Sequence, residues 1–351
     1  MNVKAALVAL LFTLAVPHPA TAQGFGGLGS AADESFAVPA PDPVFDFPRD
    51  HGPHPEYRIE WWYLTANMMG PNGTAYGLQW TLFRSALAPF ETKGWDSPQI
   101  WFGNAAVTTP TAHYTSERFA RGGTGQAGVT AAPFEAWIDE WQMRGETFDT
   151  MQLHAAGTQF SYDIALRAQG ALVFHGEDGF SVKSDQGQAS YYYSQPFFDL
   201  SGTLTLPEGD VVVTGTAWLD REWSSQPLAS DQTGWDWFSI SFDEGEKLMG
   251  FRLRQSDGSY FTSGTWIMPD GQTTALPNGS FDATPLATVD VGGRDVPVRW
   301  QVRVPEYGVD VTVTAINSQA WMDVAVPYWE GPVTVTGNRT GVGYLEMTGY
   351  D

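Results

Sequence analysis

Apolar and polar residues alternate at every second position in several short segments of the chain. The segment YGLQWTL places Tyr76, Leu78, Trp80 and Leu82 on one face of an extended backbone, and residues 310–315 alternate Asp or Thr with Val or Ala. This period is typical of a strand that is packed on one face and solvated on the other. These segments therefore predict β-structure.

Turn residues separate the predicted strands. Gly and Pro are frequent, with 38 and 23 residues, and a continuous helical stripe is absent from the sequence. Thr115–Arg121 is the one segment that we expect to form a short helix. Four pairs of turn residues predict hairpins because Asn, Asp and Gly tolerate positive φ: Asn72-Gly73, Asp257-Gly258, Asp270-Gly271 and Asn278-Gly279. We expect an all-β fold in which antiparallel sheets close into barrels and so remove their edges.

An internal repeat indicates two related β domains. Residues 215–220 and 341–346 share the pattern Gly, any residue, small, aromatic, Leu, carboxylate. Two aromatic segments, 60–63 and 235–238, also resemble each other and would open the two domains. The two matches together predict a duplicated unit that ends in the aromatic–Leu–carboxylate strand.

The N-terminus predicts export. Residues 1–22 combine a positive start, an apolar run of 12 residues at 5–16 and an Ala-Thr-Ala cleavage site, as in a secretory signal peptide. We expect a flexible lead-in at 23–44, a first barrel at 45–226 and a second barrel at 227–351. The mature protein would be secreted, to the periplasm or the medium.

Charge and cysteine content exclude several classes of function. The chain has 18 Lys and Arg against 40 Asp and Glu, a net charge of −22. This acidity argues against nucleic acid or an anionic membrane as a partner. The absence of Cys excludes disulfides, thiolate catalysis and iron–sulfur clusters.

We expect neither a metal nor another cofactor. His51 and His54 lie near Asp50 and Glu56, but Gly and Pro intervene, and we expect a loop that packs over a barrel entrance. Residues 123–128 fit G-x-G-x-x-G without the preceding strand and following helix of a dinucleotide site, so they predict a loop.

Long Trp-rich motifs resemble a known family. The similarity extends from about Phe45 to the C-terminus, and the chain resembles the secreted lipocalin-like family called AttH-like or "predicted secreted hydrolase", a relative of carotenoid 1,2-hydratase (hydroxyneurosporene synthase). The motifs that carry the resemblance are Phe47–Pro55, Glu60–Tyr63, Ala189–Ser194, Trp218–Ser224, Gly234–Phe238, Tyr328–Gly331 and Gly343–Tyr350.

The resemblance implies two packed lipocalin-like barrels and a set of candidate catalytic residues. Hydratase members add water across a terminal isoprenoid double bond. Their Tyr-x-Asp motif falls on Trp218 and Asp220, and their His-x-Trp motif falls near Tyr191 and Tyr193, where this sequence has no His.

Cofactor-free hydration needs an acid, stabilisation of the resulting cation and a positioned water. Asp220 can be the acid if burial raises its pKa, and Trp218 shares its strand face. The alternative for Asp220 is a structural carboxylate bonded to the backbone or to an arginine such as Arg221. We assign Asp220, Trp218 and Tyr191 as candidate catalytic residues.

Aromatic residues and one carboxylate near these positions are candidate ligand contacts. Trp61 and Tyr63 share a strand face, and Trp62 points the other way. Glu60 is either a polar anchor at the pocket mouth or a buried carboxylate paired with Arg58 or Arg84. The candidate ligand-binding residues are Glu60, Trp61, Tyr63, Tyr193, Trp223, Trp235 and Trp237.

Three functions are consistent with these features. The first is a secreted lipocalin-like protein that binds an apolar lipid or isoprenoid in an aromatic cavity. The second is a hydro-lyase of the carotenoid 1,2-hydratase type. The third is an accessory protein of an envelope transport system without a ligand. We expect a monomer in each case.

Overall fold

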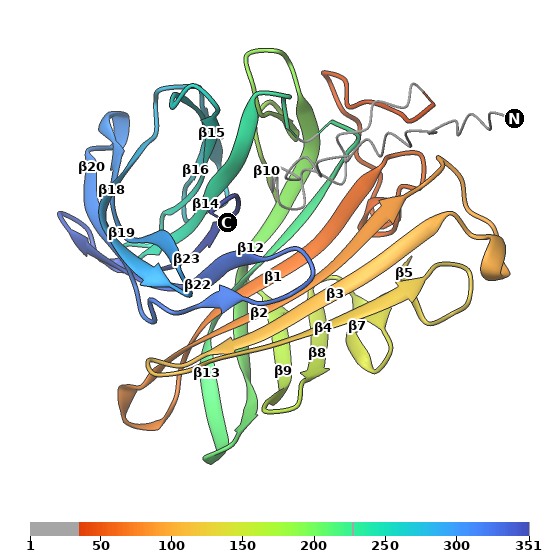
Figure 1. The fold of residues 1–351 in the computed structure, drawn as a ribbon, viewed down its shortest axis with the longest axis horizontal. Helices are drawn as coiled ribbons and strands as arrows, with labels where there is room; N and C mark the ends of the chain where they lie inside the picture. Colours follow the sequence, from red (N-terminus) through yellow and green to blue (C-terminus); the bar gives the residue numbers. More distant parts are fainter. Residues whose placement is uncertain (1–34, 227, 351) are drawn as a thin grey trace, which may run out of the picture.

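The computed structural model describes residues 35–226 and 228–350, which form two antiparallel β-sheets (Figure 1). The predicted signal peptide at 1–22 and the start of the predicted lead-in lie outside the described residues. The chain passes from the first sheet to the second between Ser224 and Gln232. In the described residues, no helix is long and apolar enough to cross a membrane.

The first sheet has 13 strands and curls into a nearly closed barrel. Its order is β4-β3-β2-β1-β13-β12-β9-β8-β7-β6-β5, with β10 and β11 paired to β12. The strands are β1 (Ile59–Met69), β2 (Ala75–Ala86), β3 (Gln99–Thr108), β4 (His113–Arg121), β5 (Ala127–Ala131), β6 (Phe134–Ile138), β7 (Trp141–Thr147), β8 (Thr150–Ala156), β9 (Ser161–Ala168), β10 (Val173–Phe174), β11 (Phe180–Val182), β12 (Ala189–Leu206) and β13 (Gly209–Ser224).

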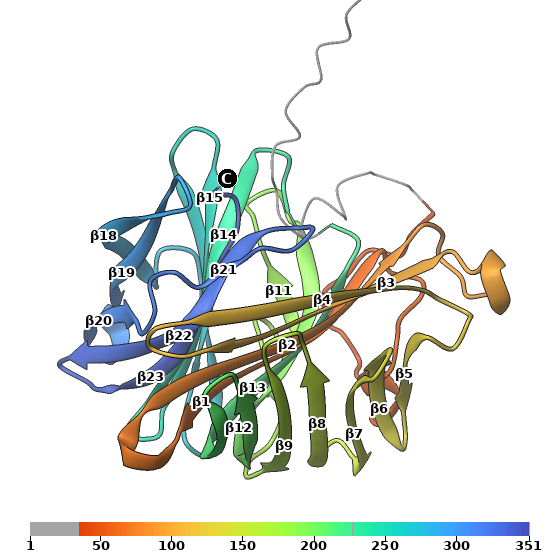
Figure 2. The same ribbon diagram turned by 60° about the horizontal axis from the view of Figure 1, so that its bottom comes forward.

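The second sheet has 10 strands and forms a half-barrel beside the first (Figure 2). Its order is β17-β16-β15-β14-β23-β22-β20-β19-β18, with β21 paired to β22. The strands are β14 (Gln232–Phe242), β15 (Lys247–Gln255), β16 (Tyr260–Ile267), β17 (Thr273–Leu276), β18 (Asp282–Val291), β19 (Arg294–Val304), β20 (Val309–Ala315), β21 (Trp321–Met322), β22 (Tyr328–Gly337) and β23 (Gly341–Met347). The predicted all-β fold with two lipocalin-like barrel domains is confirmed.

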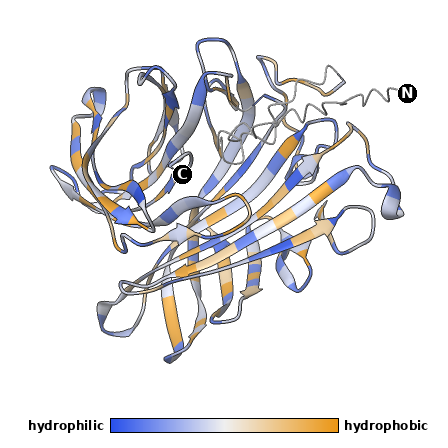
Figure 3. Cartoon of the chain, viewed as in Figure 1, coloured by the Kyte–Doolittle hydropathy of each residue, from blue (hydrophilic) through white to orange (hydrophobic). Residues whose placement is uncertain are grey.

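Side-chain alternation along β1 directs residues to two different environments. Trp62 and Leu64 lie in the core inside the first barrel, while Tyr63 lies in a separate apolar cluster between the two sheets. Figure 3 shows apolar and polar residues alternating along the strands of the first sheet. The outer face of β1 is therefore apolar as well, because it is covered by the second sheet.

The predicted helix at Thr115–Arg121 is wrong, since these residues belong to strand β4. Ala120 faces the core of the first barrel, and its neighbour Phe119 faces outward with 53% of its surface exposed. Apolar residues on both faces hide the period of two. The helical segments of the described residues are short 3-10 turns: η2 (Arg49–His51), η3 (Pro71–Gly73), η4 (Gly94–Asp96) and η5 (Pro305–Tyr307).

Three of the four predicted turn pairs join neighbouring paired strands, namely β1–β2, β15–β16 and β16–β17. The glycines of these pairs have φ of 75°, 87° and 87°, which is the left-handed conformation that the prediction requires. Asn278-Gly279 instead connects β17 to β18, which lie at opposite edges of the second sheet. Its hairpin prediction is therefore wrong.

The internal repeat corresponds to equivalent strand pairs. In the first sheet the opening strand β1 pairs with the closing strand β13, and in the second sheet β14 pairs with β23. The repeated carboxylates Asp220 and Glu346 lie on these closing strands opposite Tyr63 and Trp237, respectively. The duplication thus places one acid of each half near the seam, by which we mean the contact between the two sheets.

Residues 35–44 of the predicted lead-in lie against the first barrel. Phe36 is buried, and the backbone N–H of Ala37 donates to the carbonyl of Glu56 at 2.9 Å. The Ser225 hydroxyl donates to the carbonyl of Ala37 at 2.6 Å. This part of the segment is therefore packed on the barrel.

The seam contains a close backbone approach at Gly77. A Cβ at this position of β2 would lie 2.5 Å from Cγ and Cδ of Pro332 on β22. We expect Gly77→Ala to lower the free energy of unfolding by about 1–3 kcal/mol, because the added methyl forces the two strands apart. Denaturant unfolding measures this change. Pro332→Ala in the same chain should recover part of the loss, and purely additive effects would contradict the contact.

Candidate functional site

The predicted site residues divide between two faces of strands β1, β12 and β13. Trp61, Tyr63, Trp218 and Asp220 point toward the second sheet, and Trp235 and Trp237 meet them from β14. The side chains of Glu60, Tyr193 and Trp223 lie on the first barrel's own side of the sheet. These two groups contain nine of the ten candidates, and the parity of a residue along its strand decides to which group it belongs.

A pocket lies at the seam and draws its walls from both sheets. Its volume is about 40 Å³, which is enough for a few water molecules or for the end of a ligand. Carboxylates and aromatic rings share the lining. The lining residues are Trp61, Tyr63, Phe83, Asp220, Glu222, Trp235, Trp237, Phe251 and Glu346.

Asp220 is held at this wall by three hydrogen-bond donors. Tyr192 Oη donates to Oδ2 at 2.6 Å, and Trp218 Nε1 donates to Oδ1 at 2.5 Å. The Ser194 hydroxyl also donates to Oδ1. Burial raises the pKa of Asp220 to about 7, although the hydrogen bonds from Ser194, Tyr192 and Trp218 oppose the rise. Asp220 can therefore carry a proton near neutrality.

A histidine joins this network from an unexpected part of the chain. His175 Nε2 lies 2.6 Å from the Ser194 hydroxyl, which donates to Asp220, and His175 Nδ1 lies 2.9 Å from Thr265 Oγ1. Burial holds the pKa of His175 well below its ordinary value, so the ring is neutral. His175 follows β10, and no local motif in the sequence pointed to it.

Two further carboxylates line the same pocket. Glu222 pairs with Lys183 at 3.1 Å, and Trp235 Nε1 donates to Glu346 Oε1 at 2.6 Å. Burial raises the pKa of Glu346 to about 7. The two acids of the internal repeat, Asp220 and Glu346, thus meet in one pocket, although the sequence comparison had placed them in separate domains.

The assignment of Tyr191 to the Asp220 side is wrong. Its hydroxyl lies 3.0 Å from the backbone nitrogen of Ala40, and the neighbouring residue Tyr192 contacts Asp220. The error has a simple cause, because a shift of one residue along a strand moves a side chain to the opposite face. Tyr193 and Trp223 share the face of Tyr191 and lie away from the seam pocket.

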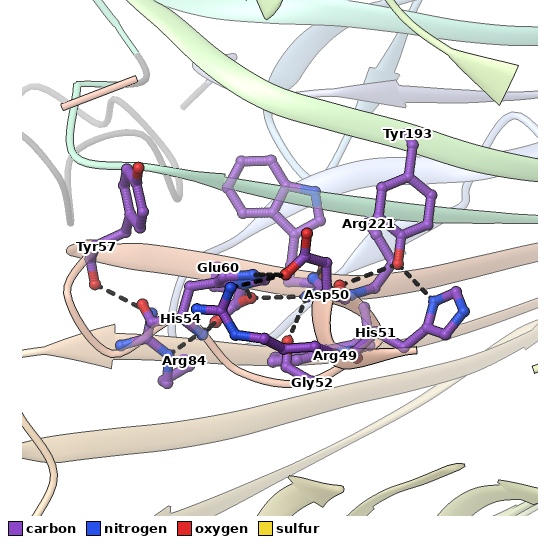
Figure 4. A network of polar contacts seen from close by, with 12 residues as sticks. Arg49, Asp50, His51, Gly52, His54, Tyr57, Glu60, Arg84, Tyr193 and Arg221 are labelled. Carbon is purple, nitrogen blue, oxygen red and sulfur yellow. Dashed lines mark hydrogen bonds and ion pairs between the residues drawn. The ribbon is translucent and has the colours of Figure 1, made fainter. Parts of the chain in front are cut away.

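Glu60 lies at the centre of a buried charge network at one end of the first barrel (Figure 4). Arg84 Nε donates to its Oε2 at 3.0 Å, and Arg221 Nη2 donates to its Oε1 at 2.7 Å. His54 Nδ1 lies 2.7 Å from Oε1. Glu60 is therefore paired with Arg84, as one of the two alternatives predicted, and not positioned at the mouth of the seam pocket.

The network fixes the charge state of its members. Burial opposes ionisation of Glu60, but Arg221, His54 and Arg84 together hold its pKa well below the ordinary value. Burial also opposes protonation of His54, but Glu60 and Asp50 outweigh it and raise the pKa of that ring. Burial and Arg221 lower the pKa of His51 to about 3. These charges are compensated within the network, which is the condition for stable burial.

The two histidines lie in the loop that covers this end of the barrel. His51 stacks on Phe148 at 3.9 Å between ring centroids, and His54 stacks on Trp223 at 3.9 Å. In residues 35–226 and 228–350, no group of three or more His, Cys, Asp or Glu side chains is arranged to hold a metal ion.

The fold and the site define a protein of two lipocalin-like barrels with an acidic, aromatic pocket at their seam. The model of the AttH-like family matches residues 38–350, and the chain belongs to this family. A putative AttH from Nitrosomonas europaea is similar to it, with 31% sequence identity and a TM-score of 0.81 over 90% of this chain and 100% of that chain.

More distant solved structures share the fold. Kievitone hydratase from Nectria haematococca has 14% identity and a TM-score of 0.66 over 90% of this chain and 96% of that chain. CghA with Sch210972 has 13% identity and a TM-score of 0.53 over 90% and 97%. No curated protein matches the sequence significantly. At this level of identity, the similarity to these structures concerns the fold.

Proposed function

We propose that this protein is a hydro-lyase that adds water to the end of an apolar alkene, or removes it, with Asp220 as the proton donor. One observation carries the proposal. Asp220 is only 2% exposed, has a pKa raised by burial to about 7, and lies on the wall of an aromatic pocket. A neutral carboxylic acid in such surroundings is suited to general-acid catalysis at neutral pH.

The pocket residues supply the remaining steps. The Asp220 proton forms a new C–H bond at one alkene carbon, and the positive charge remains on the other. The faces of Trp61 and Trp237 stabilise this cation. Water attacks the cation and gives up a proton to the carboxylate of Glu222, which lines the same pocket and is paired with Lys183. Return of that proton to Asp220 balances the cycle.

A carrier of apolar molecules is the second candidate. The aromatic lining and the lipocalin-like fold favour it, because such proteins enclose apolar ligands. The buried carboxylates favour the enzyme instead, since an apolar ligand gains nothing from acids whose burial is costly. The small volume of the pocket, about 40 Å³, also suits the end of a molecule better than a whole lipid.

Product analysis separates the two candidates. The full-length mature protein is incubated with acyclic isoprenoid alkenes, such as farnesene and squalene, in water enriched in heavy oxygen. A product that has gained one labelled water supports the hydro-lyase. Unchanged alkene bound to the protein in native mass spectrometry supports the carrier, and this result without any product overturns the proposal.

The pH dependence of the rate follows from the protonation of Asp220. Its pKa is about 7, and the acid form is the active one. We expect kcat to fall above pH 7 and to approach a decline of about tenfold per pH unit. Steady-state rates over a pH series measure this. A rate that rises through the same range would assign Asp220 as a base and contradict its role.

A further inference from the structure

Four aromatic residues form a row across the outer face of the first barrel. Trp61, Phe83, Phe102 and Phe119 are direct neighbours in register on β1, β2, β3 and β4. The centroids of successive rings are 6.3, 4.8 and 6.2 Å apart. Rings this close are in mutual contact, so the row is a continuous apolar strip.

The strip connects two cavities. Its first two rings line the seam pocket, and its last two line a groove of about 270 Å³ on β2, β3 and β4. The stacked pair Phe83 and Phe102, with an interplanar angle of 15°, lies between them, with Phe83 on the wall of the pocket and Phe102 on the wall of the groove. The apolar path from Asp220 therefore continues beyond the small seam pocket.

The second domain covers this path. Trp235, Val324 and Val326 pack on the cluster that contains Phe83 and Phe102. The segment between β21 and β22 is anchored above the groove, because the backbone N–H of Ala325 donates to Glu117 on β4 at 2.9 Å. Strand β22 contacts β2. Phe83 and Phe102 are therefore buried beneath side chains of the second domain, whereas the two ends of the strip border cavities.

The far end of the strip is exposed to solvent. Phe119 is 53% exposed and Leu87 is 59% exposed, and both line the groove. Solvent-exposed aromatic and aliphatic side chains that border a groove are typical of an apolar binding surface. The strands of the strip are about 4.8 Å apart, so the path from Trp61 to Phe119 is about 14 Å long.

We infer that this groove binds the apolar tail of the molecule whose alkene end lies at Asp220. The inference rests on the proposed function, because it extends the same site. The tail is a linear, uncharged hydrocarbon chain that extends from the seam pocket toward Phe119, and the side chains of Val324 and Val326 move aside to admit it between Phe83 and Phe102. A molecule no longer than one isoprene unit fills only the seam pocket.

The charges of the path define the ligand further. Glu117 lines the groove, and Asp220, Glu222 and Glu346 line the seam pocket. An anionic head group would face the carboxylate of Glu117 in the groove or that of Glu222 in the seam pocket. A fatty-acid anion is therefore disfavoured relative to a neutral isoprenoid of the same length.

Saturated hydrocarbons test binding without reaction. Isopentane, farnesane and phytane are delivered from cyclodextrin, and each competes with the fluorescent probe N-phenylnaphthylamine for the full mature protein. We expect affinity to rise at least about tenfold from isopentane to farnesane, because the longer chain buries additional methylene groups in the groove. Equal affinities would overturn the inference.

The decisive variant is one in which a new side chain fills the groove. Ala325→Trp places a large side chain over the groove, and Ala325 is exposed, so the fold tolerates the change. The increase of affinity with chain length should disappear. Val212→Trp, at a position that is 69% exposed and on the far part of β13, is the matched control and should keep the increase.

The outcomes distinguish this inference from the proposed function. A chain-length effect that Ala325→Trp abolishes supports the groove even when no alkene is hydrated, and the absence of hydration then counts against the hydro-lyase alone. Hydration with no effect of chain length, or a chain-length effect that survives in Ala325→Trp, overturns the tail site alone. Phe119→Ser provides a second variant, with a reduced increase expected.

Discussion

Asp220→Asn should lower kcat/KM for hydration by about 10²–10⁴-fold, the usual contribution of a general acid. The amide keeps the size of the side chain and can accept the hydrogen bond from Trp218, but it has no proton to give to an alkene carbon. Steady-state kinetics with the alkene that yields hydrated product measures the loss. A variant as active as the wild type would show that the acid lies elsewhere.

The stability of the Asp220 variant is a separate readout. A raised carboxyl pKa means that the native state binds this proton more tightly than the unfolded chain, so ionisation of Asp220 costs stability as pH rises from about 4 to 7. The neutral asparagine removes this cost, and the variant should unfold at the same temperature as the wild type or higher at pH 8. Asp199→Asn, at an exposed position on β12, controls for the loss of one charge.

Glu60→Ala should lower the free energy of unfolding by about 3–5 kcal/mol, the cost of breaking a buried ion pair. The substitution leaves the guanidinium groups of Arg84 and Arg221 buried without their common carboxylate. Urea unfolding monitored by tryptophan fluorescence measures the change. Glu208→Ala, at an exposed position, is the control and should unfold like the wild type.

The pH dependence of this loss has a definite sign. The pKa of Glu60 is lowered on folding, so its stabilising effect is present above its unfolded value near 4.5 and is lost as pH falls below it. The difference between Glu60→Ala and the wild type should therefore shrink between pH 6 and pH 3. A difference that stays constant over this range would contradict an ionic role for Glu60.

The sequence predicted the barrels and the seam aromatics because strand periodicity and repetition are local properties. Parity along the strand predicts that Trp61 and Tyr63 share one face and that Trp62 lies on the other, and the structure shows this arrangement. Parity also explains why the assignment of Tyr191 is wrong. The family motif His-x-Trp has no matching His in this sequence, so its alignment to β12 was uncertain by one residue, and one residue changes the face of the strand. The residue that contacts Asp220 is Tyr192, next to Tyr191 in the sequence.

Other parts of the site depend on contacts between distant segments. His175 reaches Asp220 through Ser194, and Lys183 reaches Glu222 from the loop before β12. Neither residue belongs to a motif, and only the folding of that loop against the seam brings them in. Glu60 shows the same limit, because the sequence predicts Arg58 or Arg84 as its partner, whereas the structure pairs it with Arg84 and also with Arg221, far along the chain.

In the proposed hydro-lyase, the shared pocket makes the chemistry depend on the assembly of the two domains. The proton on Asp220 is retained because the second barrel excludes solvent from it. A substitution that lets the halves rock apart, such as a larger residue where Gly77 meets Pro332, would hydrate that carboxyl and let it ionise. In the proposed hydro-lyase, the fit between the two halves therefore controls the protonation of Asp220, and activity can be lost while every reacting group remains intact.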